Sequence, residues 1–162
     1  AFSWQHGVFM GSMSSSEMTA ASEGTVGKLR IDSFAMKPFV GYNMADYFRH
    51  WLEMGRKLGS NAPGIFYVNW FRKDSDGKFL WPGFSENSRV LKWICERVQG
   101  KAKGVHTPIG IVPAPNSLDL HGLSLAPETM TQLLTVDPRR WLDELPQIRE
   151  YQRMFKDHMP HA

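Results

Sequence analysis

The clearest pattern along the chain is a repeat of apolar residues at helical spacing between positions 44 and 58. Asn43 is a good N-cap for this helix, and Asp46 places negative charge in the first turn, which the helix dipole favours. One face of the helix carries large apolar side chains: Tyr47, Trp51 and Met54. The sequence SNAPG then ends the helix. We therefore predict an amphipathic helix over residues 44–58.

Two further helices are predicted towards the C-terminal side. One runs from residue 85 or 86 to about Val98 and ends at the Gln99-Gly100 pair. Its predicted inner face carries Val90, Leu91, Ile94 and Val98. The other has Asp137 as its cap and Pro138 at its first helical position, and Pro146 kinks or restarts it.

Short apolar runs predict strands at residues 8–11, 28–32, 65–71, 78–81 and 108–112. The Asp76-Gly77 pair is the best two-residue turn signal and would join the third strand to the fourth as a hairpin. Helices and strand pairs together predict a mixed α/β (α+β) class, with a mixed sheet flanked by helices. These strands are few, and the chain opens within an apolar run. We therefore expect it to be cut from a longer protein whose remaining sequence completes the sheet.

Residues 12–28, SMSSSEMTAASEGTVGK, differ from the apolar runs on either side. They are small and rich in hydroxyl groups, so they would bury little surface and lose few contacts on moving. We predict a mobile loop, with a serine-capped helical turn at SSEMTAAS. Such a loop can open and close at low cost, and its closure would exclude water from a site beneath it.

Aromatic residues gather around the predicted hairpin turn. Phe71 precedes the turn, Phe79 follows it, and Phe84 comes directly after Pro82-Gly83, where the next helix begins. The first amides of that helix lack intrahelical partners, and Asn87 adds an amide side chain. Rings beside free donors suit a flat heteroaromatic ligand with carbonyl oxygens, such as a purine base. The alternative, which composition alone favours, is that aromatic residues pack beneath the turn, with Trp70, Phe79 and Trp81 all in the core.

Composition limits the function classes. The chain has 162 residues, 42% hydrophobic and 22% charged, which suits one globular domain or part of one. No run of 18 apolar residues occurs, so no membrane span is predicted. The net charge of +3 is scattered, unlike the dense basic blocks of a dedicated nucleic-acid-binding protein. Cys95 cannot form an intrachain disulfide and is predicted to be a buried, inert thiol, and the six histidines lack metal-ligand spacing.

The segment VNWFRKDSDGKFLWPGFSENSRVL, residues 68–91, closely resembles the guanine-binding segment of GTP-dependent phosphoenolpyruvate carboxykinases, VNWF…GKFLWPGFGENSRVL. The resemblance extends through WQHGVF, SEMTAASE, FAMKPFVGYN and TPIGIVP and becomes diffuse after about residue 120. The chain departs from the family at Ser85, where a glycine is usual, and at Ser15, near which the family carries an arginine. Long contiguous motifs make this resemblance specific.

The resemblance implies a C-terminal nucleotide-binding lobe of a two-lobed carboxykinase fold, incomplete in this chain. All of residues 1–162 would be part of this domain, with a Ω-loop lid region at 11–41, a guanine-binding hairpin and helix at 65–98, and C-terminal helices at 126–162. The guanine-nucleotide-binding residues would be Phe71, Phe79, Phe84, Ser85, Glu86 and Asn87. The lid residues would be Ser16, Glu17, Thr19, Ala20, Ala21, Ser22 and Glu23.

The resemblance also implies an activity, the conversion of oxaloacetate and GTP to phosphoenolpyruvate, GDP and CO₂ in gluconeogenesis, by a cytoplasmic and monomeric enzyme. The complete enzyme would use Mn²⁺ and Mg²⁺, and its metal ligands, phosphate-binding loop, reactive cysteine and substrate arginines would lie upstream. No G-x-x-x-x-G-K-S/T pattern occurs here. We therefore expect no catalytic or metal-binding residue in this chain, and no activity from it alone. We expect no nucleic-acid or membrane partner. The alternative is a non-catalytic module that stacks nucleotides or single-stranded nucleic acid on the same rings.

Overall fold

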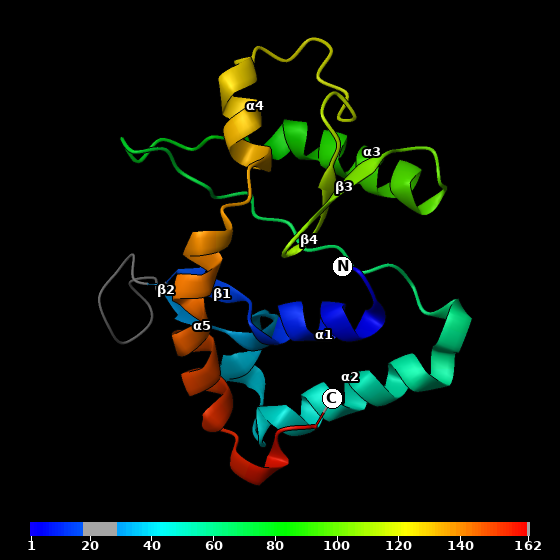
Figure 1. The fold of residues 1–162 in the computed structure, drawn as a ribbon, viewed down its shortest axis with the longest axis vertical. Coiled ribbons are helices and arrows are strands. Elements are labelled where there is room, and N and C mark those ends of the chain that lie inside the picture. The colour runs from blue at the N-terminus through cyan, green and yellow to red at the C-terminus, as the bar shows by residue number, and fades with distance from the viewer. Residues whose placement is uncertain (18–28, 162) are drawn as a thin grey trace. The chain divides into compact units, whose positions relative to one another are not determined.

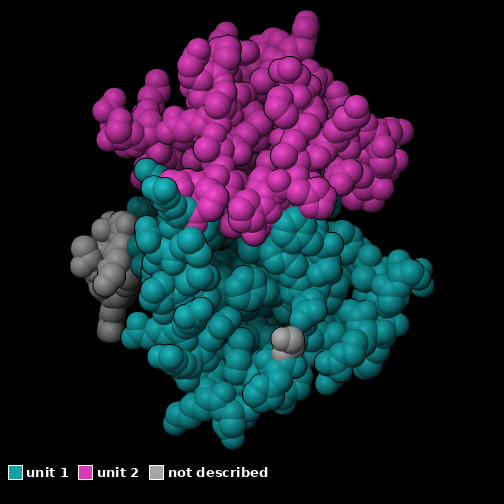
Figure 2. Space-filling model, viewed as in Figure 1, with its two compact units in different colours: residues 1–67, 139–162 teal, residues 68–138 magenta. Residues whose placement is uncertain are grey.

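A computed structural model describes residues 1–17 and 29–161 of the chain. Within these residues, helices flank two small antiparallel sheets, which confirms the predicted mixed α/β class (Figure 1). The chain divides into two compact units (Figure 2). Unit 1 comprises residues 1–67 and 139–162, and unit 2 comprises residues 68–138. Among the described residues, every helix is too short or too polar to cross a membrane.

Unit 1 is built around helix α2, Met44–Leu58, which the sequence predicted correctly. The Asn43 side chain accepts a hydrogen bond from the Ala45 amide at 3.0 Å, and Asp46 lies in the first turn. Helix α5, Pro138–Arg153, runs through Pro146 as one helix, so the predicted restart there is wrong. The core of the unit joins both helices and consists of Met44, Ala45, Phe48, Tyr151 and Phe155.

The strand predicted at residues 8–11 is wrong, because these residues belong to helix α1, Trp4–Ser12. Ser3 caps α1 by accepting a hydrogen bond from the His6 amide at 3.1 Å. Glycines allow this helix to pack closely on its neighbours. A Cβ atom at Gly7 would clash with the Ile65 side chain, and one at Gly11 would clash with the Phe34 ring. Tertiary packing therefore selects a helix where a short apolar run suggested a strand.

Strands β1, Ser15–Glu17, and β2, Leu29–Ile31, pair antiparallel, with Ser15 opposite Ile31. The strand predicted at 28–32 is thus confirmed. The helical turn predicted at SSEMTAAS is wrong for Ser15–Glu17, which form a strand. The rest of that predicted turn lies outside the described residues. Two 3₁₀ turns follow, Ser33–Ala35 and Lys37–Phe39.

Polar side chains fix the base of this strand pair. The buried Asp32 carboxylate accepts hydrogen bonds from the Ser16 hydroxyl and the Lys37 amide, both at 3.0 Å. Ser33 donates its one hydroxyl proton to the Ser12 carbonyl at 2.6 Å, so Tyr151 must be the donor in its 2.6 Å contact with Ser33. Helix α5 is thereby bonded to the chain beside β2. Burial also raises the pKa of Tyr151, which keeps this donor protonated.

Unit 2 contains helix α3, Asn87–Val98, preceded by a 3₁₀ turn at Phe84–Glu86. Strands β3, Gly104–Thr107, and β4, Gly110–Pro113, pair antiparallel, and helix α4 spans Pro127–Leu134. Strand β4 confirms the apolar strand predicted near 108–112.

The helix face predicted for α3 is partly wrong. Trp93 is its buried residue, whereas Leu91 and Val98 are exposed. Cys95 is also exposed, so the prediction of a buried thiol is wrong. Trp93, one residue away from the predicted stripe, is instead the residue that α3 turns inward, and its indole N–H donates to the Ser117 hydroxyl at 3.1 Å.

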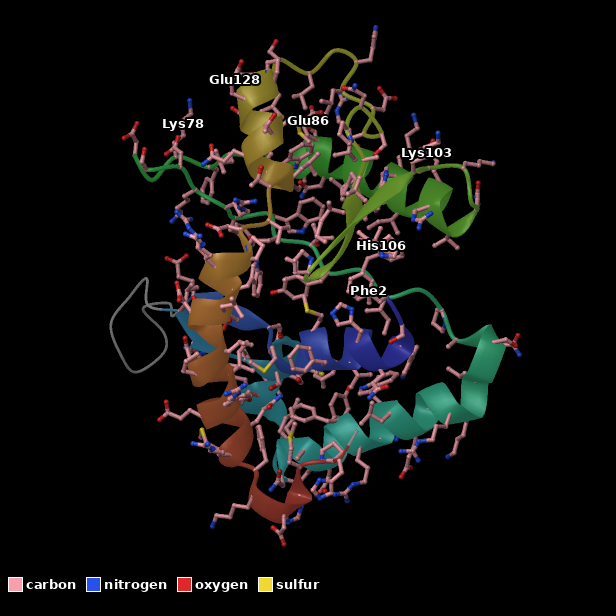
Figure 3. All side chains as sticks on the ribbon, viewed as in Figure 1. Phe2, Lys78, Glu86, Lys103, His106 and Glu128 are labelled. Carbon is pink, nitrogen blue, oxygen red and sulfur yellow. The ribbon has the colours of Figure 1, made fainter. Side chains whose placement is uncertain are left out.

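The predicted hairpin has its turn but lacks its strands. Gly77 has φ = 80°, its amide donates to the Asp74 carbonyl at 3.2 Å, and the Asp74 amide donates to the Lys78 carbonyl at 2.9 Å. Figure 3 shows Lys78 at this hairpin. Residues 65–71 form no strand, and a single bridge pairs Lys73 with Phe79. The Asn69 side chain accepts the Phe71 amide at 2.9 Å, which turns the backbone away from a ladder.

Candidate functional site

The structure separates the aromatic residues of the hairpin into core and surface. Leu80 and Trp81 are buried, with Trp81 5% exposed. Phe71, Phe79 and Phe84 are 69%, 52% and 97% exposed. The predicted core placement therefore holds for Trp81 and is wrong for Phe79, and Trp70 is half-buried. The Phe71 and Phe84 rings are thus open to a ligand, whereas the Lys73 ammonium lies over the Phe79 ring, 5.2 Å from its centroid.

Phe71 and Phe79 lie together, and Phe84 lies apart from them. The bridge between Lys73 and Phe79 brings the first two ring centroids to 6.2 Å, with their planes inclined by 62°. Within the described part of the chain, Phe84 has no ring contact with either one. Phe71 and Phe79 thus form one pair of neighbouring rings, and the turn before α3 positions Phe84 separately.

That turn depends on Gly83, whose φ of 84° is strained for any residue with a side chain. The Glu86 amide donates to the Gly83 carbonyl at 2.9 Å and starts the 3₁₀ turn. The amides of Phe84 and Ser85 precede this first bond and have no acceptor among the described residues. The predicted free donors are therefore present, on two residues of the motif itself.

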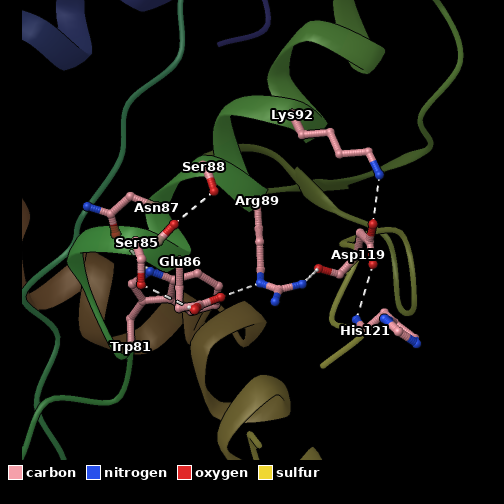
Figure 4. A network of polar contacts seen from close by, with 9 residues as sticks. All are labelled: Trp81, Ser85, Glu86, Asn87, Ser88, Arg89, Lys92, Asp119 and His121. Atoms are coloured by element: carbon pink, nitrogen blue, oxygen red, sulfur yellow. Dashed lines mark hydrogen bonds and ion pairs between the residues drawn. The ribbon is translucent and has the colours of Figure 1, made fainter. Parts of the chain in front are cut away.

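Asn87 is the first residue of α3, and its side chain is already engaged on one side. Its Oδ1 atom accepts a hydrogen bond from the Trp81 indole N–H at 2.9 Å (Figure 4). Beside it, the Ser88 hydroxyl donates to the Ser85 carbonyl at 2.8 Å, which ties the first turn of α3 to the 3₁₀ turn. The polar groups at this helix start are therefore held in fixed positions.

Glu86 joins a network of charges that sequence reasoning missed. The Arg89 guanidinium donates to the Glu86 carboxylate and to the Asp119 carbonyl, the latter at 2.7 Å (Figure 4). Lys92 donates to the Asp119 carboxylate at 2.7 Å. The network fastens the loop at Asp119 onto α3. The three-residue spacing of Glu86 and Arg89 could have indicated their pairing, whereas nothing in the sequence marks Asp119.

These contacts shift pKa values in the directions expected for ion pairs. The hydrogen bond from Arg89 holds the pKa of the Glu86 carboxyl below its usual value. The Lys92 ammonium, through its hydrogen bond, lowers the pKa of Asp119, and Asp119 in turn raises the pKa of Lys92. Glu86 therefore stays ionised beside the helix start to lower pH than an isolated glutamate would.

Replacing Arg89 with glutamine in the full-length protein should raise the pKa of Glu86. Because that pKa is depressed in the folded state, the stabilisation from the pair is present above the unfolded glutamate pKa and is lost as pH falls through the folded value. Carboxyl ¹³C NMR with labelled glutamate, assigned with Glu86→Gln, measures the titration. Lys92→Gln is the matched control, since Lys92 contacts Asp119 and leaves Glu86 paired. An unchanged Glu86 titration in Arg89→Gln would contradict the pairing.

The structure describes only part of the predicted lid. Ser16 and Glu17 lie in β1, whereas Thr19, Ala20, Ala21, Ser22 and Glu23 lie outside the described residues.

Within residues 1–17 and 29–161, no group of three His, Cys, Asp or Glu side chains could hold a metal ion. These residues therefore do not fit a divalent metal.

Comparisons with known proteins cover the whole chain. The family model described as phosphoenolpyruvate carboxykinase C-terminal P-loop domain matches residues 1–162. The chain is 53% identical, over 99% of its length, to phosphoenolpyruvate carboxykinase (GTP) of Neocallimastix frontalis, of which it covers 26%. It is 50% identical over 100% of its length to the protein of the same name from Chlamydia abortus, covering 27%, and 51% identical over 93% to that from Thermoplasma volcanium, covering 25%. The chain thus spans about a quarter of these relatives.

Proposed function

Because the chain belongs to the GTP-dependent phosphoenolpyruvate carboxykinase family, we propose that it forms the guanine-binding part of such an enzyme. The full-length enzyme would convert oxaloacetate and GTP to phosphoenolpyruvate, GDP and CO₂. One observation carries the proposal: Phe84 exposes its ring at a helix start with unpaired amides, and Phe71 and Phe79 expose theirs as a pair of rings beside the hairpin turn.

In this proposal the rings bind the base and the polar groups recognise its edge. Stacking of a base on an aromatic side chain contributes about 1–3 kcal/mol. The Phe84 and Ser85 amides and the Asn87 side chain supply hydrogen bonds to the base, and Glu86 is held nearby by Arg89. This part of the enzyme would therefore choose the nucleotide, and the reaction itself would take place on residues elsewhere.

The proposal includes a lid over residues 11–41, with Ser16 and Glu17 at its stem. The stem is well fixed, because β1 pairs with β2 and Asp32 bonds both Ser16 and Lys37. A firm stem would let the segment between the strands close over substrate without disturbing the core. Thr19, Ala20, Ala21, Ser22 and Glu23 would belong to this closing segment.

The metal and the cellular setting are also part of the proposal. A carboxykinase of this family would use Mn²⁺ and Mg²⁺, and their ligands would lie outside the described residues, which offer no site for them. The enzyme would be monomeric, would act in the cytoplasm in gluconeogenesis, and would bind neither nucleic acid nor membrane.

The test is to assay the full-length protein for phosphoenolpyruvate formation and to measure nucleotide binding in parallel. We expect turnover with oxaloacetate and GTP, with GDP bound more tightly than ADP. The alternative, a platform that stacks single-stranded nucleic acid, would accept any base and lose affinity steeply with salt. Competition with GDP by a single-stranded oligonucleotide, without preference for guanine, would therefore favour the platform and overturn the proposal.

A further inference from the structure

We propose that Trp81 is a positioning residue for base selection: its indole N–H fixes the Asn87 amide so that the NH₂ group, and not the oxygen, faces the nucleotide base. The inference rests on the proposed function and extends it, because it names the group that would distinguish a 6-oxopurine from a 6-aminopurine. The argument depends on which atom of Asn87 faces Trp81.

The chemistry of indole settles that orientation. The Trp81 Nε1 atom lies 2.9 Å from the Asn87 side chain, and an indole N–H can donate but cannot accept. The atom facing it must therefore be the Asn87 oxygen, although amide oxygen and nitrogen are otherwise easily exchanged. Trp81 is itself buried, so its ring has no freedom to follow a rotated amide.

The consequence is that Asn87 presents a donor to the ligand. Figure 4 shows the amide nitrogen of Asn87 directed away from Trp81. No acceptor for this nitrogen occurs within the described part of the chain. Guanine carries an accepting carbonyl at position 6, whereas adenine carries a donating amino group there. A fixed NH₂ group therefore matches guanine and faces another donor in adenine.

The indole bond also makes the mismatch hard to relieve. An Asn87 free to rotate could turn its oxygen towards the adenine amino group and accept from it. With Trp81 in place, that rotation would set the NH₂ group against the indole N–H and leave the donor of the buried Trp81 ring unpaired, which costs free energy. Selectivity would thus come from Trp81 as much as from Asn87.

The chain offers a matched control in a second buried tryptophan. Trp93 lies in α3, and its indole N–H donates to the Ser117 hydroxyl at 3.1 Å. A tryptophan-to-phenylalanine change at either position removes one indole hydrogen bond and reduces a buried ring by the same amount. The two variants differ in that Trp81 bonds Asn87 and Trp93 does not.

The experiment compares Trp81→Phe with Trp93→Phe in the full-length protein. Calorimetric titration gives the affinities for GDP, inosine diphosphate and ADP. For Trp81→Phe we expect the preference for GDP over ADP to fall about tenfold, equivalent to about 1.4 kcal/mol. Inosine diphosphate has the 6-carbonyl group without the 2-amino group, so its preference over ADP should fall by the same factor. Trp93→Phe should keep the wild-type preference.

Asn87→Asp is the second variant and does not disturb Trp81. Aspartate keeps an oxygen for the indole N–H and presents an acceptor to the base, so we expect it to abolish the preference for GDP. An unchanged preference in Trp81→Phe or in Asn87→Asp would overturn the inference. Phe84→Ala distinguishes failure of this inference from failure of the proposed function. If Phe84→Ala weakens GDP binding, the guanine-binding site is supported and only the role of Trp81 is overturned. If Phe84→Ala also leaves GDP binding unchanged, both proposals fall.

Discussion

Replacing Phe84 with alanine in the full-length protein should raise the KM for GTP by about 5- to 150-fold, which corresponds to the loss of one stacked base. The Phe84 side chain is 97% exposed, so its removal costs almost no packing within the fold. The effect should therefore fall on nucleotide binding and leave stability unchanged. Steady-state kinetics with GTP and oxaloacetate varied in turn provide the measurement.

The KM for oxaloacetate is the internal control for Phe84→Ala, and Leu142→Ala is the external one. Leu142 is an exposed apolar residue of α5, outside the aromatic motif, so its replacement should change neither KM. Equal increases in the KM values for GTP and oxaloacetate would contradict a role in base stacking. They would instead indicate a general disturbance of the enzyme.

Replacing Phe48 with alanine should lower the free energy of unfolding by about 3–5 kcal/mol, as expected when a buried aromatic ring is removed and a cavity is left. Phe48 is 2% exposed and lies at the centre of unit 1. Its ring centroid lies 5.3 Å from that of Phe155 and 6.0 Å from that of Phe34. Denaturant unfolding of the full-length protein, followed by tryptophan fluorescence, measures the change.

Leu142→Ala again serves as the control for Phe48→Ala, since its exposed side chain should leave the unfolding midpoint near that of the wild type. The two variants also differ in where they act. Phe48→Ala should destabilise unit 1, whereas the affinity of the folded protein for GDP should be unaltered. A wild-type midpoint for Phe48→Ala would mean that the core of unit 1 is not organised around this ring.

Helix α2 shows where the sequence predicts the structure well. Its cap, its first-turn charge and its apolar face are local signals within one segment, and each appears where expected. The turn at Asp74–Gly77 is local in the same way, because Gly77 adopts the positive φ that favours glycine there. Features that neighbouring residues determine among themselves could be predicted.

Helix α1 shows where such reasoning fails. Its apolar run is short enough to suit a strand, and the decisive contacts are made by Ile65 and Phe34, which are distant in the sequence. Ser3 was the one local signal for a helix, and it was missed. The strand predicted at residues 65–71 is wrong for a different reason. A β-rich composition forms a strand only where a partner strand is available, and here the Asn69 side chain bonds the nearby Phe71 amide instead.

The candidate site was predictable in its rings and unpredictable in its polar contacts. The motif places all three phenylalanines next to turns, and the structure exposes all three, but only Phe71 and Phe79 lie together. The bond from Trp81 to Asn87 depends on side-chain rotation, and the contact of Arg89 with Asp119 depends on how a loop returns to α3. Neither leaves a periodic or compositional trace in the sequence.

The division of unit 1 into two stretches of sequence has a consequence for how the protein is made. Tyr151 contacts Ser33 across 118 residues, and all of unit 2 is encoded between the two halves. On the ribosome, unit 2 is therefore complete while the apolar face of α2 still lacks α5. Contacts this distant slow folding, and an uncovered apolar face invites aggregation in the meantime. We therefore expect unit 1 to complete its core only after α5 has been synthesised, whereas unit 2 can begin to fold earlier from its own contiguous residues.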